Sequence, residues 1–184
     1  MTTVTARPAR VTTDRDAADA RWEVTVLKQP GGFAEVTRSA GAVVVCVGDH
    51  EASRDEDDRH APDGHGPCCT TVRCGGGGRV VVTALAAPPV LLVGSTRTVL
   101  VPSTPSEAGT AVVEPGERLL VLSAAAFDTL PPALVSVLRE LPHRVLDASP
   151  VSVLETVFSE IPIGCGALIS PVRRDTQSGR TEFP

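Results

Sequence analysis

The chain has few aromatic residues, and this scarcity limits the kind of core it can form. Aromatic residues make up 3% of the 184 residues, and Val, Leu and Ala carry most of the apolar content. Small branched side chains favour β-strands that pack tightly on one another. A chain of this length can bury one hydrophobic core, and we expect the only tryptophan, Trp22, to anchor it.

Clusters of basic residues are also missing. A single lysine, Lys28, accompanies sixteen arginines spread along the sequence, and the formal net charge is −5. Proteins that bind a nucleic-acid backbone neutralise its phosphates with clustered Lys and Arg. The composition therefore argues against nucleic acid as the main partner.

Signals for export and membrane insertion are missing as well. Residues 1–20 are polar and lack the apolar centre of a signal peptide. Apolar runs reach roughly eight residues, whereas a membrane-spanning helix needs ~20. The five cysteines are an odd number, which argues against a disulfide framework. We expect a cytoplasmic protein with no membrane contact.

Composition divides the chain into one domain and two unstructured ends. Residues 1–20 and 173–184 show no hydrophobic periodicity, so we expect a disordered leader and a disordered tail. The expected domain spans residues 21–172. Within it, residues 49–67 contain the acidic run Asp55–Asp58 together with His, Gly and Pro, which predicts a flexible solvated loop.

Hydrophobic periodicity predicts mainly strands, followed by helices. The expected strands are 22–28, 33–39, 42–47, 70–74, 79–86, 90–93, 98–101, 110–114 and 118–122, and a closing strand covers 166–172. Helical spacing appears at 124–130, 132–141 and 150–161. The pair Pro115-Gly116 predicts a hairpin between the last two strands before the helices. This order indicates an α+β fold built on antiparallel sheet.

Five segments follow one another in a characteristic order. They read KQPGGFAEV, AVVVCVGDHEA, GRVVVTALAAPPVLLV, VEPGERLLVLSAAAFDTL and GCGALISPVRR. In this order they resemble the SpoIIE/RsbU branch of the PPM metal-dependent serine/threonine phosphatases, over about Trp22 to Arg173. The resemblance implies an antiparallel β-sandwich with helices packed mainly on one side.

The resemblance also implies where a catalytic centre would lie. Members of this family hold two divalent cations, usually Mn²⁺ or Mg²⁺, with aspartates at strand ends, and the metals activate a water that attacks phosphoserine or phosphothreonine. At the matching positions this chain has Phe33, Ala124 and the pair Gly164-Cys165, and it keeps only Asp49. One carboxylate cannot hold two hard cations close together. We therefore expect no cofactor and no catalytic residue.

Three further departures from the family pattern follow from the same comparison. Ala52 replaces a glycine beside the family site, and Ala87 replaces the histidine before a proline pair. The family's long helices after the Gly-Asp strand are replaced here by the loop at 49–67. One helical layer is therefore expected to be missing. The sheet face that it would cover should be bare and available to a partner.

Asp49 also allows a weaker metal site. It could bind a single cation together with His50, Glu51 or the run Asp55–Asp58. We favour the simpler interpretation, in which Asp49 ends a strand and the acidic run is solvated, since flexible acidic segments rarely form defined sites.

The cysteines and histidines allow two other interpretations. Zinc-ligating residue types gather at His60, His65, Cys68, Cys69 and Cys74, but their spacing does not match a usual finger or knuckle. Cys46 and Cys165 fall on expected central strands, where core packing is favoured over nucleophilic catalysis. Ser123 does not lie in a Gly-x-Ser-x-Gly nucleophile motif.

Three hypotheses for function result. The first is a catalytically inactive pseudophosphatase that binds a protein partner in bacterial sigma-factor partner-switching, such as a phosphorylated anti-sigma-factor antagonist or an active phosphatase. The second is a reduced but active phosphatase that uses Asp49 and Mn²⁺ or Mg²⁺. The third is a structural subunit, in a homo- or hetero-oligomer, that docks through an uncovered sheet face.

Overall fold

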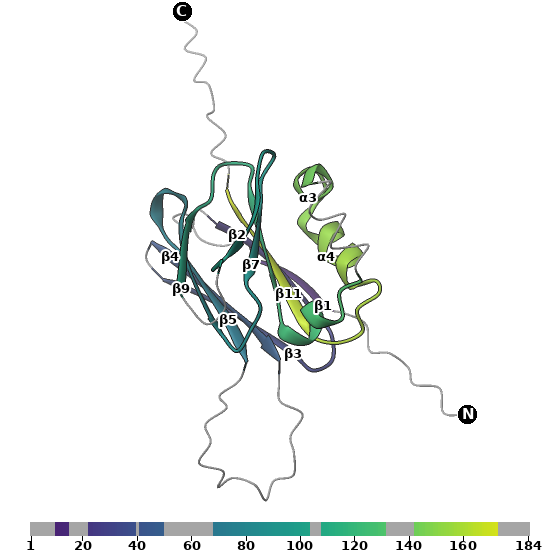
Figure 1. Ribbon diagram of the computed structural model, residues 1–184. Helices are drawn as coiled ribbons and strands as arrows, with labels where there is room; N and C mark the ends of the chain where they lie inside the picture. Colours follow the sequence, from purple (N-terminus) through teal and green to yellow (C-terminus); the bar gives the residue numbers. More distant parts are fainter. Residues whose placement is uncertain are drawn as a thin grey trace, which may run out of the picture.

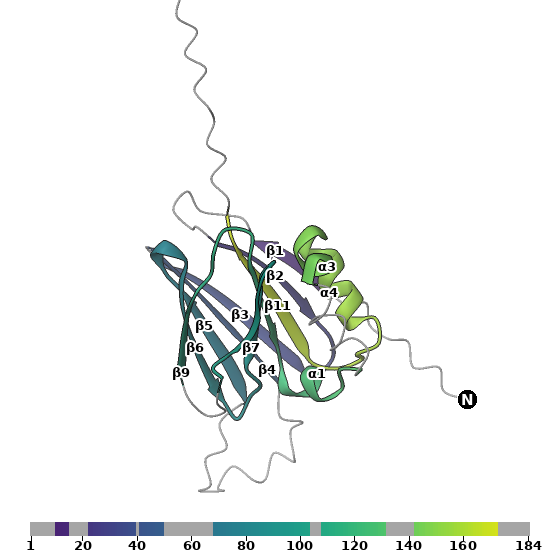
Figure 2. The same cartoon turned by 45° about the horizontal axis from the view of Figure 1, so that its top comes forward.

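A computed structural model describes residues 10–14 as backbone, and residues 22–39, 41–49, 68–103, 108–131 and 142–172 in full. Two antiparallel sheets pack face to face, and the described helices lie against one of them (Figures 1 and 2). The expected α+β fold, an antiparallel β-sandwich with helices mainly on one side, is confirmed. No helix within these residues is long and apolar enough to cross a bilayer.

Every strand pairing in the two sheets is antiparallel. The six-stranded sheet has the order β1 (Arg10–Asp14), β2 (Trp22–Lys28), β11 (Cys165–Pro171), β10 (Arg118–Leu122), β7 (Val90–Val93) and β8 (Thr98–Val101). The five-stranded sheet has the order β3 (Gly32–Ser39), β4 (Ala42–Asp49), β5 (Cys69–Cys74), β6 (Arg79–Leu85) and β9 (Ala108–Val112).

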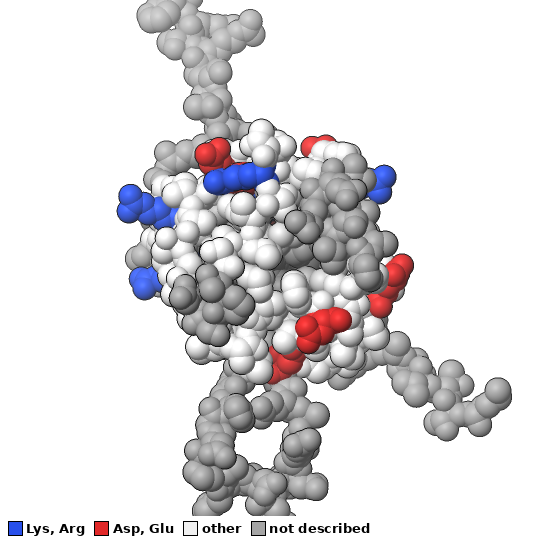
Figure 3. Space-filling model, viewed as in Figure 1, with Lys and Arg blue, Asp and Glu red and all other residues white. Residues whose placement is uncertain are grey.

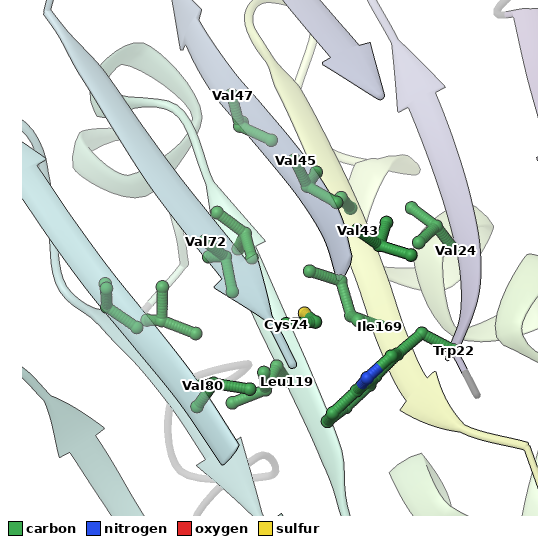
Figure 4. Packing of buried hydrophobic residues seen from close by; sticks show 14 of the residues in the cluster. Trp22, Val24, Val43, Val45, Val47, Val72, Cys74, Val80, Leu119 and Ile169 are labelled. Atoms are coloured by element: carbon green, nitrogen blue, oxygen red, sulfur yellow. The ribbon is translucent and has the colours of Figure 1, made fainter. Parts of the chain in front are cut away.

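The main core lies between the two sheets (Figure 4). Side chains alternate strictly along β6, where Val80, Val82 and Ala84 are buried and the residues between them are exposed. Most of the core residues are valines, which suit the expectation from the low aromatic content. The indole N–H of Trp22, on β2, donates a hydrogen bond to the carbonyl of Gly75 at 3.0 Å, so this side chain joins the six-stranded sheet to the β5–β6 turn.

A second core forms where helices cover the outer face of the six-stranded sheet. These helices are α1 (Ala124–Asp128), α3 (Pro142–Asp147) and α4 (Pro150–Phe158). Ser149 caps the start of helix α4, because its Oγ accepts a hydrogen bond from the backbone N–H of Ser152 at 3.1 Å. The helix buries one apolar stripe, Val153, Leu154, Val157 and Phe158, against the sheet.

The outer face of the five-stranded sheet differs from that of the six-stranded sheet. Within the described part of the chain no helix packs on it, and the helices in Figures 1 and 2 lie beyond the other sheet. Val81, Leu85 and Val112 are 42%, 61% and 51% exposed there. This agrees with the expected loss of one helical layer, as far as the described residues extend.

Two expectations are corrected. Arg10–Asp14 was expected to be unstructured, but it forms β1 and pairs with β2, because its β-branched residues suit a strand once an edge is available. The hairpin at Pro115-Gly116 is wrong: β9 pairs with β6 and β10 pairs with β7 and β11, so this turn carries the chain from one sheet to the other. A tight turn reverses the chain but does not decide which strands pair.

Other expectations differ in extent or fall outside the description. Helix α3 was not predicted, and α1 and α4 are shorter than the expected 124–130 and 150–161. The expected helix at 132–141, the acidic loop after Asp49, the tail at 173–184 and the rest of the leader lie outside the described residues.

An ion pair between the exposed Arg97 and the buried Glu117 ties the two sheets together near β9. The carboxylate of Glu117 is 7% exposed and accepts hydrogen bonds from Nε and Nη2 of Arg97, both at 2.7 Å, and from the backbone N–H of Glu114 at 2.8 Å. Nη2 of Arg97 also donates to the carbonyl of Val112, on β9, at 2.7 Å. Burial alone would raise the pKa of Glu117, but the bonds from Arg97 and Glu114 and the charge of Arg97 outweigh it and hold the pKa below 4.5.

We expect Glu117→Ala to lower the free energy of unfolding by about 1–3 kcal/mol, because it leaves Arg97 and the Glu114 N–H without an acceptor. Because the folded pKa is depressed, the contribution of Glu117 is present above pH 4.5 and is lost as the pH falls through the folded pKa. Urea denaturation at pH 7 and at pH 3 measures both effects. A variant that loses as much stability at pH 3 as at pH 7 would contradict this role.

Candidate functional site

One end of the sandwich brings together the residues that the sequence singled out. The β2–β3 turn meets the start of β11 there: the N–H of Gln29 donates to the carbonyl of Gly164 at 2.9 Å, and the N–H of Gly164 donates to the carbonyl of Pro30 at 3.0 Å. The end of β4 and the junction between β10 and α1 adjoin the same place. We call this region the strand-end centre; it comprises Phe33, Asp49, Ser123, Ala124, Gly164 and Cys165.

Asp49 is the last residue of β4 and lies opposite Gly32 on β3. Its Oδ2 accepts a hydrogen bond from the backbone N–H of Ala125 at 2.8 Å, which links the five-stranded sheet to the first turn of α1. Its Oδ1 is buried and has no hydrogen-bond partner among the described residues. One oxygen of this carboxylate therefore caps helix α1, and the other has no partner among the described residues.

Ser123 closes the same turn from the other sheet. Its side chain is 1% exposed, and its Oγ accepts hydrogen bonds from the backbone N–H groups of Ala126 at 3.4 Å and Cys165 at 3.1 Å. Its own N–H donates to the carbonyl of Cys165 at 2.9 Å. Two amides at the start of α1 are thus satisfied by Asp49 and Ser123, and Ser123 is a structural residue.

Cys165 fills the space between the two sheets at this end. Its Sγ lies 2.8 Å from the carbonyl oxygen of Phe33 and 3.3 Å from that of Gly48, so its single S–H proton is shared between two acceptors. Burial raises the pKa of this thiol to about 12, and the negative charge of Asp49 adds to the rise. The thiol stays protonated at neutral pH and is no nucleophile.

Packing leaves little room at the strand-end centre for larger side chains. The ring of Phe33 lies over Gly48, where an added Cβ would come within 2.6 Å of a ring carbon. Gly164 has a φ of +87°, and a Cβ there would lie 2.5 Å from the Oγ of Ser123. At Gly164, where the family resemblance leads one to expect an aspartate, the neighbouring residues Ser123 and Ala126 leave no room for a side chain.

The donor set that the described residues supply at this centre does not fit a pair of divalent cations. Hard cations need several oxygen ligands, and two of them need enough negative charge to lie close together. Asp49 supplies the one side-chain carboxylate, while Phe33, Ala124 and Cys165 supply none. Within the described ranges, no three His, Cys, Asp or Glu side chains group closely enough to hold a metal ion.

Other residues considered for metal binding lie elsewhere. Ala52, His50, Glu51 and the run Asp55–Asp58 fall outside the described residues. Ala87 lies in the β6–β7 connection, next to Pro88, whose carbonyl accepts a hydrogen bond from Oγ1 of Thr70.

The possible zinc ligands do not share one face of the sheet. Cys69 and Cys74 are five residues apart on β5, so their side chains point to opposite faces. Cys74 is buried in the main core, where burial raises the pKa of its thiol to about 12. Cys69 lies on the outer face near Cys46, and burial followed by the proximity of Cys46 raises the pKa of Cys69. His60 and His65 lie outside the described residues.

Sequence reasoning found the position of Asp49 but missed what Ser123 does. Ser123 was weighed only as a nucleophile, although a serine directly before Ala124-Ala125-Ala126 at a strand-to-helix change is a helix N-cap signal. The second bond of Ser123, to Cys165 forty-two positions later in the chain, has no local sequence signal.

This arrangement of two packed antiparallel sheets is similar to the fold of solved PPM-type phosphatase domains. The solved phosphatase domain of SpoIIE from Bacillus subtilis matches with a TM-score of 0.58 and 10% identity over 89% of this chain and 99% of that one. RsbX in complex with magnesium matches with a TM-score of 0.53 and 10% identity, over 87% of this chain and 98% of that one. The RsbU and RsbW domains of a Mycobacterium tuberculosis protein match with a TM-score of 0.51 and 12% identity, over 91% of this chain and 63% of that one.

No protein-family model and no curated protein matches the sequence. At identities of 10–12% the similarity to these structures establishes the fold, and the chemistry has to be argued from the residues of this chain.

We expect Asp49→Ala to lower the free energy of unfolding by about 1–2 kcal/mol, because the Ala125 N–H at the start of α1 loses its acceptor. Urea denaturation followed by circular dichroism measures the change. The matched control is Asp147→Ala at an exposed position, for which a change within about 0.5 kcal/mol is expected. Equal stabilities for Asp49→Ala and the natural chain would show that the cap contributes nothing.

The five cysteines should differ in reactivity. Because the pKa values of Cys74 and Cys165 are raised to about 12, iodoacetamide at pH 8 should leave both unmodified in the folded protein, whereas the partly exposed Cys46, Cys68 and Cys69 react. In 8 M urea all five should react. Mass spectrometry of tryptic peptides measures the pattern, and rapid modification of folded Cys165 would contradict its described environment.

Proposed function

We propose that this chain is a catalytically inactive pseudophosphatase, a PPM-type scaffold that binds a protein partner without hydrolysing phosphate. The observation that carries the proposal is the strand-end centre, where Asp49 is the single carboxylate among the described residues and its Oδ2 is bound to the Ala125 N–H. Two cations held close together would repel each other there, and no metal-bound hydroxide would form. On this proposal the protein needs no cofactor.

The similarity in fold to SpoIIE, RsbX and an RsbU domain supports a setting in partner-switching regulation. In that setting the chain would act in the cytoplasm and bind a phosphorylated anti-sigma-factor antagonist, or pair with an active phosphatase. Binding such a phosphoprotein without dephosphorylating it would compete with the active enzyme.

A second candidate function is a reduced phosphatase that uses one Mn²⁺ or Mg²⁺ at Asp49. The observation that favours it is the buried Oδ1 of Asp49, which has unused acceptor capacity among the described residues. A third candidate is a structural subunit that docks through the outer face of the five-stranded sheet, and the exposure of Val81, Leu85 and Val112 favours it.

Phosphatase activity separates the first two candidates. The purified chain is incubated with 1 mM Mn²⁺ and a phosphoserine peptide, and released phosphate is measured beside an active PPM phosphatase. We expect no turnover above the background without protein, and the same result for Asp49→Ala. Turnover that disappears in Asp49→Ala would establish the second candidate and overturn the first.

Metal affinity gives an independent test. Isothermal titration with Mn²⁺ should show no site tighter than about 1 mM, the weak end for carboxylate sites. A tighter site that is lost in Asp49→Asn, a variant of similar shape without the negative charge, would contradict the pseudophosphatase. Asp147→Asn, at an exposed position away from the strand-end centre, is the matched control.

A further inference from the structure

Strand β8 is an edge strand that the described residues leave without the usual protection. It forms one end of the six-stranded sheet and pairs only with β7 among the described strands. Its four residues, Thr98 to Val101, include no charge, and Val99 and Leu100 are 41% and 46% exposed. Soluble proteins usually cover such edges or place charged residues on them, because an open edge pairs with other strands.

The direction of the free backbone groups on β8 follows from the ladder. The N–H of Gly94 donates to the carbonyl of Arg97 at 2.7 Å, so this pair is hydrogen-bonded across the β7–β8 ladder. Bonded and non-bonded pairs alternate in an antiparallel ladder, so Val99 bonds to Leu92, while Thr98 and Leu100 point their N–H and C=O groups away from β7. No described residue hydrogen-bonds to those four groups.

The other edges of the sandwich differ from β8. On β9, the outward carbonyl of Val112 accepts a hydrogen bond from Arg97, which Glu117 holds in place. Strand β3 carries Glu35 and Arg38. Strand β1 has a charged residue at each of its ends. In the described structure, β8 therefore combines unused backbone groups with an uncharged sequence.

We propose that β8 pairs with β8 of a second copy of this chain, in an antiparallel dimer centred on Val99. In this register Thr98 lies opposite the second copy's Leu100, and Leu100 lies opposite the second copy's Thr98. The four outward N–H and C=O groups of each β8 then bond to complementary groups on the other β8. The six-stranded sheets of the two copies join into one continuous sheet. This pairing is independent of whether the proposed function is correct.

Charge and burial favour a second copy as the occupant. A partner strand must be extended, uncharged and aliphatic, and β8 itself has this composition. In this register Arg97, beside β8, lies opposite the second copy's Val101 and not opposite another arginine, and its charge is paired with Glu117 of its own chain. In Figure 3 most of the middle of the face drawn is uncharged, and the charged side chains lie toward its margins.

An apolar cavity extends the proposed contact surface. It has a volume of about 590 Å³ and lies between β7, β8, β10 and α1. Its lining includes Leu91, Leu100, Leu120, Leu122, Phe127 and Leu130. Pairing at β8 would cover the rim of this cavity at Leu100 and so remove more apolar surface from water. A contact of four residues per strand is still smaller than a standard interface of ~800 Å² per partner, so the dimer should be weak.

Sedimentation velocity of the full chain from about 5 µM to about 1 mM tests the proposal. We expect the weight-average mass to rise from the monomer toward the dimer over this range. Leu100→Lys, which places a charge on the edge, should stay monomeric at every concentration. The matched control, Leu85→Lys, makes the same change on the outer face of the other sheet and should dimerise like the natural chain. Circular dichroism and thermal unfolding confirm that both variants fold.

Amide hydrogen exchange gives a second readout that needs no variant. The amides of Thr98 and Leu100 should exchange about tenfold more slowly at 1 mM than at 5 µM. The amide of Val99, already bonded to β7, should not change with concentration. A natural chain that is monomeric at 1 mM, or a dimer lost in Leu85→Lys and kept in Leu100→Lys, would overturn the proposal.

Discussion

The hydrogen bond between the Asp49 carboxylate and the Ala125 N–H is the contact on which the strand-end centre depends. It joins the end of β4 to the start of α1, across seventy-six positions of sequence, and so brings the five-stranded sheet against the helical side of the other sheet. A carboxylate that serves as a helix cap has fewer lone pairs to offer a cation. Around it, Phe33, Gly164 and Cys165 are packed against backbone groups. Of the two carboxylate oxygens of Asp49, Oδ2 thus serves the fold, while Oδ1 has no partner among the described residues.

The fold could be derived from the sequence largely because strand positions follow from local alternation. The segment 79–85 alternates buried and exposed residues, and the boundaries of 22–28, 90–93, 98–101 and 118–122 were predicted as they are observed. What failed depends on contacts that are distant in sequence. Pro115-Gly116 is a turn, but the partners of β9 and β10 are chosen by the packing of whole sheets. Strand β1 forms only because β2 presents an edge to it.

The candidate site shows the same division. The identity of Asp49, and the lack of carboxylates at Phe33, Ala124 and Gly164, are visible in the sequence. Two features are not: Ser123 binds both Ala126 and Cys165, and the ring of Phe33 lies over Gly48. Local sequence patterns identify the residues at strand ends, but the strand topology decides which of those ends lie next to one another. Whether a site is open or closed therefore has to be read from the structure.

Trp22 provides an intrinsic fluorescence probe of the main core. As the only tryptophan, it sits 3% exposed between the sheets, with its indole N–H bonded to the carbonyl of Gly75. The chain contains no tyrosine, so ultraviolet emission excited at long wavelength comes from this one ring. A red shift of that emission would report water reaching the space between the two sheets, separately from any change in the helices on the far side.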